Sequence, residues 1–516
     1  MTHTALAALA DRTDRTDRTG RTDRIVLRDD RDTFTAGRAL DTVHRLARAL
    51  CDRGLGPGGT AALMGPVSTR MYLLLRAIEL TGAAQVELPL ALAVPDQVGL
   101  AAACRATHVV ADPAATDPAA VRSVAALPGV RLLALAAPGP GEDVFAAAEA
   151  LPAEPFASRA RPGDPGRISL TGGTTGRAKP VLRRHRPLRP FSARWLEPLL
   201  TGGPVRMLKT DRLTGLGLAL GDATLVCGGE FTTLPEFTPE AALSAVRRLG
   251  VTHMVIAPHQ LRGLVEHPGA AEGGLASLRC VISATAATGP ALLKRAVAVL
   301  GPIVHPTYGQ TESGNITRLS PDDYAGWDPA VTRSCGRPVP GAHVEVRDPQ
   351  GRTLPEGRRG HVWVRTPQLM DEYLDRPEDT GRVLRDGLLD TGDIGYQDAR
   401  GFLTVLGRSG DAMVVNGGTV FASEVDTVLQ EHPGVREAAT FDVHGDGGAT
   451  LHTAVAPRPG ADVTEGELRE LLAPRLDPRH MPSSFMFVSR IPLTYAHERC
   501  PTTLRHWHAA RASERT

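Results

Sequence analysis

Short apolar runs alternate with amphipathic helical patterns along much of the chain. The apolar runs that predict buried strands lie at 60–65, 108–112 and 130–136, and the patterns that predict helices lie at 39–55 and 68–83. The same alternation of strand and helix resumes near 242–300. Strands that alternate with helices in this way predict a parallel sheet with helices on both faces.

The pattern changes after residue 335. There a turn-rich stretch, GRPVPGAHVEVRDPQGRTLPEGRRGHVWVRTP, alternates in the way typical of antiparallel strands. From Arg408 onward a smaller segment combines helical patterns with short apolar runs, and the glycine-dense GRSGD at 407–411 is expected to be a hinge. We therefore expect a large N-terminal body over 25–407 and a small α+β C-terminal lid over 408–516.

The first 24 residues are expected to be a disordered leader. They include the repeat DRTDRTDRTGRTDR at 11–24, which alternates in charge and has no apolar face. Such a segment cannot offset its ordering entropy by burying surface.

Charge and composition narrow the class of protein. The 58 basic and 57 acidic residues leave a formal charge of +1, so no strong field favours nucleic acid or an anionic membrane as a partner. No apolar run approaches the roughly 18 residues of a membrane span, and the N-terminus does not resemble a secretory signal. The six cysteines are scattered without CxxC spacing, which indicates neither a zinc site nor a disulfide framework. A cytoplasmic protein is expected.

Lysine is rare in this chain. Only Lys179, Lys209 and Lys294 occur, beside a large excess of arginine. Base composition of the gene explains that bias, but its chemical consequence remains: a step that requires a lysine has few candidates.

The most informative motif is ISLTGGTTGRAKPV at 168–181, where an apolar strand runs into a loop rich in glycine and threonine. The residues that could cradle phosphate groups are Thr171, Gly172, Gly173, Thr174, Thr175, Gly176 and Lys179. Glycines let main-chain N–H groups approach phosphate oxygens, and a lysine adds a compact charge. The P-loop pattern does not fit, because Arg-Ala-Lys-Pro follows Gly176. A flexible surface loop is the alternative.

A second motif, HPTYGQTESG at 305–314, brings together an aromatic ring, a hydroxyl and a carboxylate. Tyr308 and Gly309 precede Thr311 and Glu312. A tyrosine can stack on a nucleobase, a threonine can contact a phosphate, and a carboxylate suits Mg²⁺. Alone, this stretch also reads as an ordinary turn.

A third motif, LLDTGDIGYQDARGFLTVLGRSGD at 388–411, contains Asp393 in what we expect to be a tight turn, with Arg408 at the hinge. A carboxylate can bind a ribose diol through two hydrogen bonds. The alternatives are an Asx turn for Asp393 and a surface ion pair for Arg408.

In this order and spacing, the three motifs resemble those of the acyl-adenylate-forming enzymes: acyl-CoA synthetases, peptide-synthetase adenylation domains and luciferases. The resemblance extends from about residue 25 nearly to the end of the chain. It implies an α/β fold, with a large N-terminal body of two parallel-sheet α/β subdomains plus a small β-barrel-like subdomain, followed by the α+β lid. It also implies ATP (with AMP as the product) and Mg²⁺ as ligands, and a small-molecule acid as the substrate.

The resemblance assigns roles residue by residue. Thr171–Gly176 with Lys179 would bind the phosphates, and Ala284, Thr285 and Ala286 would lie against the adenine. Tyr308 and Gly309 would line the adenine site, with the ring of Tyr308 stacked on the base. Thr311 would contact the α-phosphate, and Glu312 would hold Mg²⁺. Asp393 and Arg408 would bind the ribose hydroxyls, and the segment 411–426 resembles the loop that lines a thiol channel.

The C-terminus departs from the family pattern. Relatives carry Pro-x-Thr-x-x-Gly-Lys, and the corresponding text here is IPLTYAHERC, with Glu498 in place of the lysine. Loss of a transition-state donor costs about 10²–10³ in rate. Arg499 or Arg505 could substitute for it, the substrate could need less assistance, or adenylation could be impaired.

Several functions therefore stay open. The first is a ligase that activates a carboxylate and passes it to CoA or to the phosphopantetheine thiol of a carrier protein. The second is a diazotase that activates nitrite for an aryl amine, and the third is a nucleotide-binding pseudoenzyme. The substrate stretch expected at 185–260 is rich in arginine, which indicates a polar or anionic substrate unless these are solvated surface residues.

Overall fold

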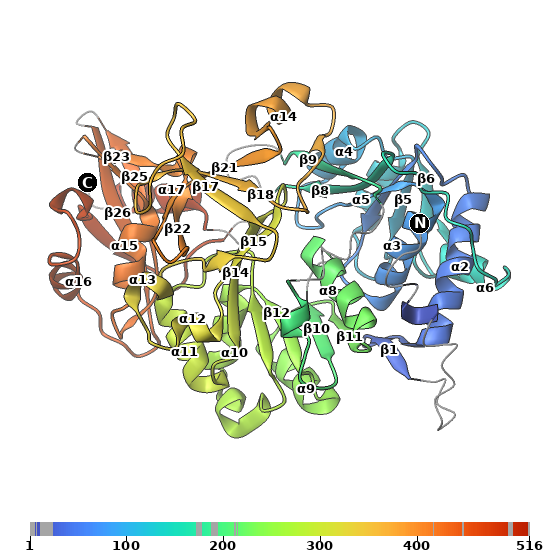
Figure 1. Cartoon of the computed structure of the whole chain (residues 1–516), viewed down its shortest axis with the longest axis horizontal. Helices are drawn as coiled ribbons and strands as arrows, with labels where there is room; N and C mark the ends of the chain where they lie inside the picture. Colours follow the sequence, from blue (N-terminus) through green and yellow to red (C-terminus); the bar gives the residue numbers. More distant parts are fainter. Residues whose placement is uncertain are drawn as a thin grey trace.

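The computed structural model describes residues 6, 8–10, 24–171, 178–186, 195–210, 213, 215–415, 417–445, 448–493 and 499–513. Two large, mainly parallel sheets form the N-terminal body, and smaller sheets, antiparallel or mixed, lie toward the C-terminal end of the chain (Figure 1). The α/β fold expected from the sequence is confirmed.

The first sheet has nine strands in the order β16-β15-β14-β13-β12-β10-β11-β1-β2. Its strands are β1 (Ile25–Arg28), β2 (Thr33–Thr35), β10 (Arg206–Thr210), β11 (Glu230–Leu234), β12 (His253–Ile256), β13 (Cys280–Ser283), β14 (Val304–Gln310), β15 (Gly314–Arg318) and β16 (Arg337–Pro338). The strands from β14 to β1 pair in parallel. The carboxyl ends of β13 and β14 therefore meet at one edge, where ligands bind in such sheets.

Helices cover both faces of this sheet. On one face Leu208, Met254 and Val281 pack with α9 (Pro239–Leu249), α10 (Pro258–Glu266) and α11 (Pro290–Leu300). On the other face Met207 and Ile282 join a core shared with α8 (Gly215–Val226) and the second sheet. Successive residues of a strand thus reach opposite cores, as the two-residue period of a strand requires.

The second sheet has eight strands in the order β19-β9-β8-β4-β3-β5-β6-β7. They are β3 (Thr60–Met64), β4 (Ala84–Glu87), β5 (His108–Ala111), β6 (Arg131–Ala134), β7 (Glu142–Asp143), β8 (Pro165–Leu170), β9 (Pro180–Arg184) and β19 (Glu372–Tyr373). Its helices are α2 (Ala36–Asp52), α3 (Thr69–Thr81), α4 (Val94–Ala103), α5 (Pro118–Ala125) and α6 (Val144–Glu149). Helix α2 begins three residues before its apolar pattern, because Thr35 caps it by accepting from Arg38 N at 3.3 Å.

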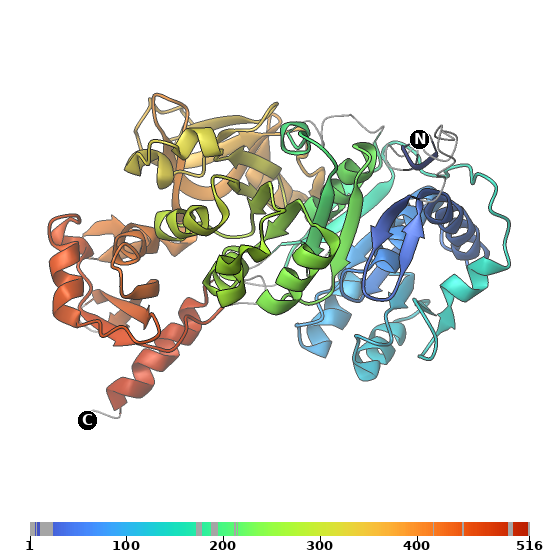
Figure 2. The ribbon, with the colours of Figure 1, turned by 90° about the horizontal axis from the view of Figure 1, so that it is seen from below.

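An antiparallel sheet of β17 (His343–Arg347), β18 (Gly360–Arg365), β20 (Leu384–Arg385), β21 (Leu388–Gln397) and β22 (Leu403–Arg408) follows. The C-terminal unit contains the pair β23 (Met413–Val415) and β24 (Gly418–Val420), and the sheet of β25 (Val435–Gly445), β26 (Gly448–Pro457) and β27 (Ser484–Phe487). Its helices are α15 (Ala422–Leu429), α16 (Glu465–Leu472) and α17 (Pro501–Ser513), the last of which projects from the unit in Figure 2. Ion pairs join this unit to the body: Arg262 to Glu437, and Glu266 to Arg436 and Arg458.

Part of the expected leader belongs to the folded core. Of residues 1–24, the structure describes 6, 8–10 and 24. Leu6 and Leu9 are buried in the core that α2 and α3 share. The low-complexity repeat itself lies outside the described residues except for Arg24. Within the part of the chain that the structure covers, no helix is long and apolar enough to cross a membrane.

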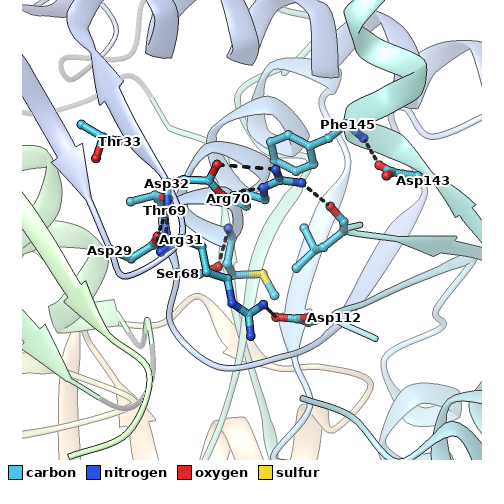
Figure 3. A network of polar contacts seen from close by, with 12 residues as sticks. Asp29, Arg31, Asp32, Thr33, Ser68, Thr69, Arg70, Asp112, Asp143 and Phe145 are labelled. Atoms are coloured by element: carbon cyan, nitrogen blue, oxygen red, sulfur yellow. Dashed lines mark hydrogen bonds and ion pairs between the residues drawn. The ribbon is translucent and has the colours of Figure 1, made fainter. Parts of the chain in front are cut away.

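A polar network fastens the β1–β2 hairpin to the second sheet (Figure 3). Asp29 accepts hydrogen bonds from Thr69 N at 2.8 Å and from Thr69 Oγ1 at 2.7 Å, at the start of α3. Asp32 binds Arg70 Nε at 2.7 Å, and the Arg70 guanidinium lies 5.0 Å from the Phe145 ring centroid. These two links therefore connect segments that are 38 and 40 residues apart in the sequence.

We expect Asp29→Ala to lower the free energy of unfolding by about 2 kcal/mol, because the variant leaves donors at the start of α3 without their charged acceptor. Asp30→Ala is the matched control, since the side chain of Asp30 is exposed. Thermal melts of the two variants test the prediction, and equal melting temperatures would contradict it.

Candidate active site

Asp393 is the centre of a buried polar cluster. Its side chain is 6 % exposed, and it accepts hydrogen bonds from the Tyr308 hydroxyl and from Gln310 Nε2, the latter at 2.7 Å. Arg408 Nε lies 3.2 Å from its other carboxylate oxygen. Tyr308 and Gln310 come from β14, whereas Asp393 and Arg408 face each other across β21 and β22. The structure thus brings together three residues singled out in the sequence.

The prediction that Asp393 lies in a tight turn is wrong. Asp393 lies within strand β21, and the local irregularity comes from Gly392, whose φ of +71° is left-handed. The Asp393 main-chain N–H donates to Thr391 Oγ1 at 3.1 Å. The carboxylate is therefore held by a bent strand.

The Asp393 carboxylate is shielded from solvent, and its burial shifts the pKa values of the groups in this cluster. Burial raises the pKa of Asp393, and the nearby charge of Arg408 and the hydrogen bonds from Tyr308 and Gln310 oppose that rise. Burial and the Asp393 charge raise the pKa of Tyr308 well above its ordinary value, so its hydroxyl stays a donor. Arg408 Nη1 also donates to Thr391 O at 2.8 Å.

Strand β14 needs a glycine near its end, just before the turn to β15. A Cβ on Gly309 would lie 2.3 Å from Gly314 O, across the β14–β15 pair. Glu312 follows in this turn, and its carboxylate accepts a hydrogen bond from the Tyr373 hydroxyl at 2.7 Å. Its main-chain oxygen accepts from Met370 N, also at 2.7 Å. Both the side chain and the main chain of Glu312 are thus held by the segment that contains β19.

The ammonium group of Lys179 lies over the ring of Tyr373, the tyrosine that binds Glu312. Its Nζ is 5.0 Å from the Tyr373 ring centroid and 3.6 Å from Asp379 Oδ2. Burial and the Glu312 carboxylate raise the pKa of Tyr373, so its hydroxyl keeps its proton. Tyr373 therefore connects the lysine beside the threonine-glycine loop to the expected metal ligand.

Thr171 and Lys179 close the threonine-glycine loop. Lys179 N donates to Thr171 Oγ1 at 2.9 Å, and Thr171 N donates to Lys179 O at 3.1 Å. The intervening candidates, Gly172, Gly173, Thr174, Thr175 and Gly176, lie outside the described residues. Their role in binding phosphate stays a prediction.

The small residues Ala284, Thr285 and Ala286 follow directly after β13. Thr285 has a left-handed φ of +78°, which marks a sharp change of direction at the strand end. Thr307 Oγ1, on the neighbouring strand β14, donates to Ser283 O at 3.3 Å. The turn at 284–286 thus lies beside the strand that carries Tyr308.

The sequence motifs assign no role in the nucleotide site to three residues of this region: Gln310, Tyr373 and Arg183. Gln310 stands inside the Tyr-Gly-x-Thr-Glu motif, so its position was a signal that could have been used. Tyr373 and Arg183 contact Glu312 and Thr311 across 61 and 128 residues of sequence. No local pattern indicates such contacts.

The two arginines that could replace the absent lysine have carboxylate partners within the C-terminal unit. Arg499 binds Asp426, whose side chain is 1 % exposed, and Arg505 Nη2 lies 2.5 Å from Asp442 Oδ1. Burial raises the pKa of Asp426 despite the charge of Arg499. Although burial alone would raise the pKa of Asp442, the Arg505 contact holds it below its usual value. Glu498 itself lies outside the described residues.

The donor set at Glu312 suits Mg²⁺ that is shared with substrate phosphates. Mg²⁺ is commonly bound by one or two carboxylates together with phosphate oxygens and water. Glu312 supplies one oriented carboxylate. Within the described ranges, no group of three His, Cys, Asp or Glu side chains forms a dedicated metal cage.

Comparison with known proteins decides the family. Residues 14–374 match the AMP-binding enzyme family, and residues 424–497 match the AMP-binding enzyme C-terminal domain. The chain belongs to the AMP-binding enzyme family. The sequence-based resemblance to acyl-adenylate-forming enzymes is thereby confirmed.

Several relatives of this AMP-binding enzyme align over nearly the full chain. It is 29 % identical to the fatty acid–acyl-carrier-protein ligase ScoC of Streptomyces coeruleorubidus, over 87 % of this chain and 86 % of that protein. It is also 29 % identical to a feruloyl-CoA synthase of an Amycolatopsis species, over 88 % and 89 %. The solved amide bond synthetase McbA of Marinactinospora thermotolerans has a TM-score of 0.86 and 31 % identity, over 98 % of this chain and 99 % of that one.

Proposed function

We propose that this protein is an ATP-dependent ligase that activates an organic carboxylate as an acyl-adenylate, releases pyrophosphate, and passes the acyl group to the thiol of CoA or of a carrier protein. The cluster of Tyr308, Asp393 and Arg408 is the observation that carries the proposal. It places a buried carboxylate beside an aromatic ring at the edge where the strands of an α/β sheet end.

In this proposal residues 25–407 form the body that holds the nucleotide, and residues 408–516 form the lid. Asp393 accepts hydrogen bonds from the ribose hydroxyls, with Arg408 beside it. The Tyr308 ring stacks on the adenine, and Gly309 with Ala284, Thr285 and Ala286 lines the rest of the adenine site. ATP thereby lies with its phosphates toward Thr311.

At the phosphates, the loop from Thr171 to Gly176 and Lys179 bind the oxygens, and Thr311 contacts the α-phosphate. Glu312 holds Mg²⁺, which when bound neutralises charge on the phosphate oxygens. The substrate carboxylate attacks the α-phosphorus in line, and pyrophosphate leaves. Catalysis then rests on positioning and electrostatic stabilisation of the transition state.

The relatives support a carboxylate substrate over nitrite. ScoC is named a fatty acid ligase and the Amycolatopsis protein a feruloyl-CoA synthase, and both names denote activation of a carboxylic acid. An amine is the second candidate acceptor, because McbA is named an amide bond synthetase and aligns with 98 % of this chain.

Pyrophosphate release with a panel of acids tests the proposal. The panel contains fatty acids of different length, aryl acids and nitrite, each with ATP and Mg²⁺. We expect release with at least one carboxylate, and mass spectrometry after addition of CoA, a carrier protein or an amine identifies the acceptor. Release with nitrite alone, or ATP binding without release for every acid, would contradict the proposal.

Glu498 provides a separate prediction. We expect Glu498→Lys to leave ATP affinity unchanged and to raise the rate of pyrophosphate release about tenfold or more, because the change restores the donor that relatives carry at this position. Glu470→Lys, on helix α16, is a control for the change in net charge. Loss of activity in Glu498→Lys would show that the native glutamate has a positive role.

A further inference from the structure

Arg183 lies directly behind the turn that carries Thr311 and Glu312. It is on β9, between β8 and β19, and the residue is partly buried. Its Nη2 donates to Thr311 O at 2.5 Å, and its Nε donates to Gln368 O at 2.9 Å. One side chain thus joins three segments that are far apart in the sequence.

The segment around Gln368 holds the same turn by other contacts. Asn315 N donates to Gln368 Oε1 at 3.0 Å, and Thr366 Oγ1 donates to Ser313 O. Met370 N donates to Glu312 O. Arg183 contacts both this segment and Thr311, so it helps the segment around Gln368 to fix the position of the turn.

The hydrogen-bond partners of Arg183 differ in charge from those of the neighbouring arginines Arg184 and Arg186. Arg184 pairs with Glu372 and Arg186 with Asp371, whereas the hydrogen-bond acceptors of Arg183 are two carbonyl oxygens. Burial, helped by the charge of Arg167 opposite it, lowers the pKa of Arg183 to about 10, and the Glu312 carboxylate opposes this shift. Hydrogen bonds from a charged donor to carbonyls are stronger than neutral ones.

We propose that Arg183 is a positioning residue for adenylation: its guanidinium fixes the main chain at Thr311, and thereby sets where the Thr311 hydroxyl and the Glu312 carboxylate meet the phosphates and Mg²⁺. The inference rests on the proposed function. It concerns the support of the site, since Arg183 acts through the Thr311 carbonyl and contacts no substrate atom in this role.

Three variants test this role. Arg183→Met removes both hydrogen bonds, Arg183→Lys keeps the charge and one donor head, and Arg184→Met is the matched control on the same strand. We expect Arg183→Met to lower kcat for pyrophosphate release about 30-fold and to raise the Mg²⁺ concentration for half-maximal rate about tenfold. Arg183→Lys recovers part of both losses, and Arg184→Met changes neither.

A purely structural role would give other results. Arg183→Met would then match wild type in Mg²⁺ dependence, with any loss of rate following the loss of folded protein in thermal melts. If Arg183→Met does not fold, Arg183→Lys decides: wild-type rate and Mg²⁺ dependence in that variant overturn the proposal, and a raised Mg²⁺ requirement supports it.

Calorimetry separates this inference from the proposed function. If the wild-type protein binds ATP but releases no pyrophosphate with any acid, the proposed function fails. The inference is then tested by binding alone: Arg183→Met should bind ATP with Mg²⁺ about tenfold more weakly than wild type and ATP in EDTA equally well. Equal affinities in both conditions would overturn it.

Discussion

Asp393→Asn is expected to weaken ATP binding about a hundredfold while leaving the fold intact. Two hydrogen bonds from ribose hydroxyls to a charged acceptor are worth about 1.5 kcal/mol or more each, and the amide cannot accept both with the same strength. The carboxylate is 6 % exposed and already oriented by Tyr308, Gln310 and Arg408. Isothermal titration with ATP measures the change.

Asp398→Asn is the matched control for this experiment. Asp398 lies just beyond the end of β21 and binds Arg400 and the main chain of its own turn. We expect its affinity for ATP to equal that of wild type. If Asp393→Asn binds ATP as tightly as the control does, Asp393 does not bind the ribose.

Glu312→Gln is expected to lower kcat for pyrophosphate release about 10²–10³-fold, which is the cost of removing one group that stabilises a transition state. The amide preserves an acceptor for the Tyr373 hydroxyl but removes the charge that suits Mg²⁺. Raising the Mg²⁺ concentration should restore only a small part of the rate. Steady-state assays of pyrophosphate release over a range of Mg²⁺ concentrations measure both effects.

Glu372→Gln serves as the control for Glu312. Its carboxylate, in the neighbouring strand β19, pairs with Arg184 and is 37 % exposed. Its kcat and Mg²⁺ dependence should match those of wild type. If Glu312→Gln leaves the Mg²⁺ dependence unchanged, Glu312 does not bind Mg²⁺.

The alternation of strands and helices was sufficient to predict the α/β body, because each element buries one face against a neighbour. The runs at 60–65 and 108–112 became β3 and β5, adjacent parallel strands of the second sheet. Helix α17 has no amphipathic pattern by which the sequence could indicate it, because Leu504 is its one buried apolar residue within the described side chains. Leu6 and Leu9 are buried although the repeat that follows them at 11–24 has no apolar face.

The candidate site was predictable in its residue types and less so in its contacts. Tyr308, Asp393 and Arg408 stand in motifs that can be read locally, and the structure brings them together. The motif predicts a turn at Asp393 because a glycine precedes the aspartate. Strand β21 nevertheless continues through this position, and Gly392 adopts its left-handed φ within the strand. Arg183 and Tyr373 reach the site through tertiary packing, which no local pattern encodes.

A crystal structure of the protein with ATP and Mg²⁺ is the most direct measurement of the nucleotide site. The account predicts ribose hydroxyls within hydrogen-bond distance of the Asp393 carboxylate, adenine against the Tyr308 ring, and phosphates between Lys179 and Glu312. A nucleotide bound elsewhere, with Asp393 making only its contacts to Tyr308, Gln310 and Arg408, would contradict it.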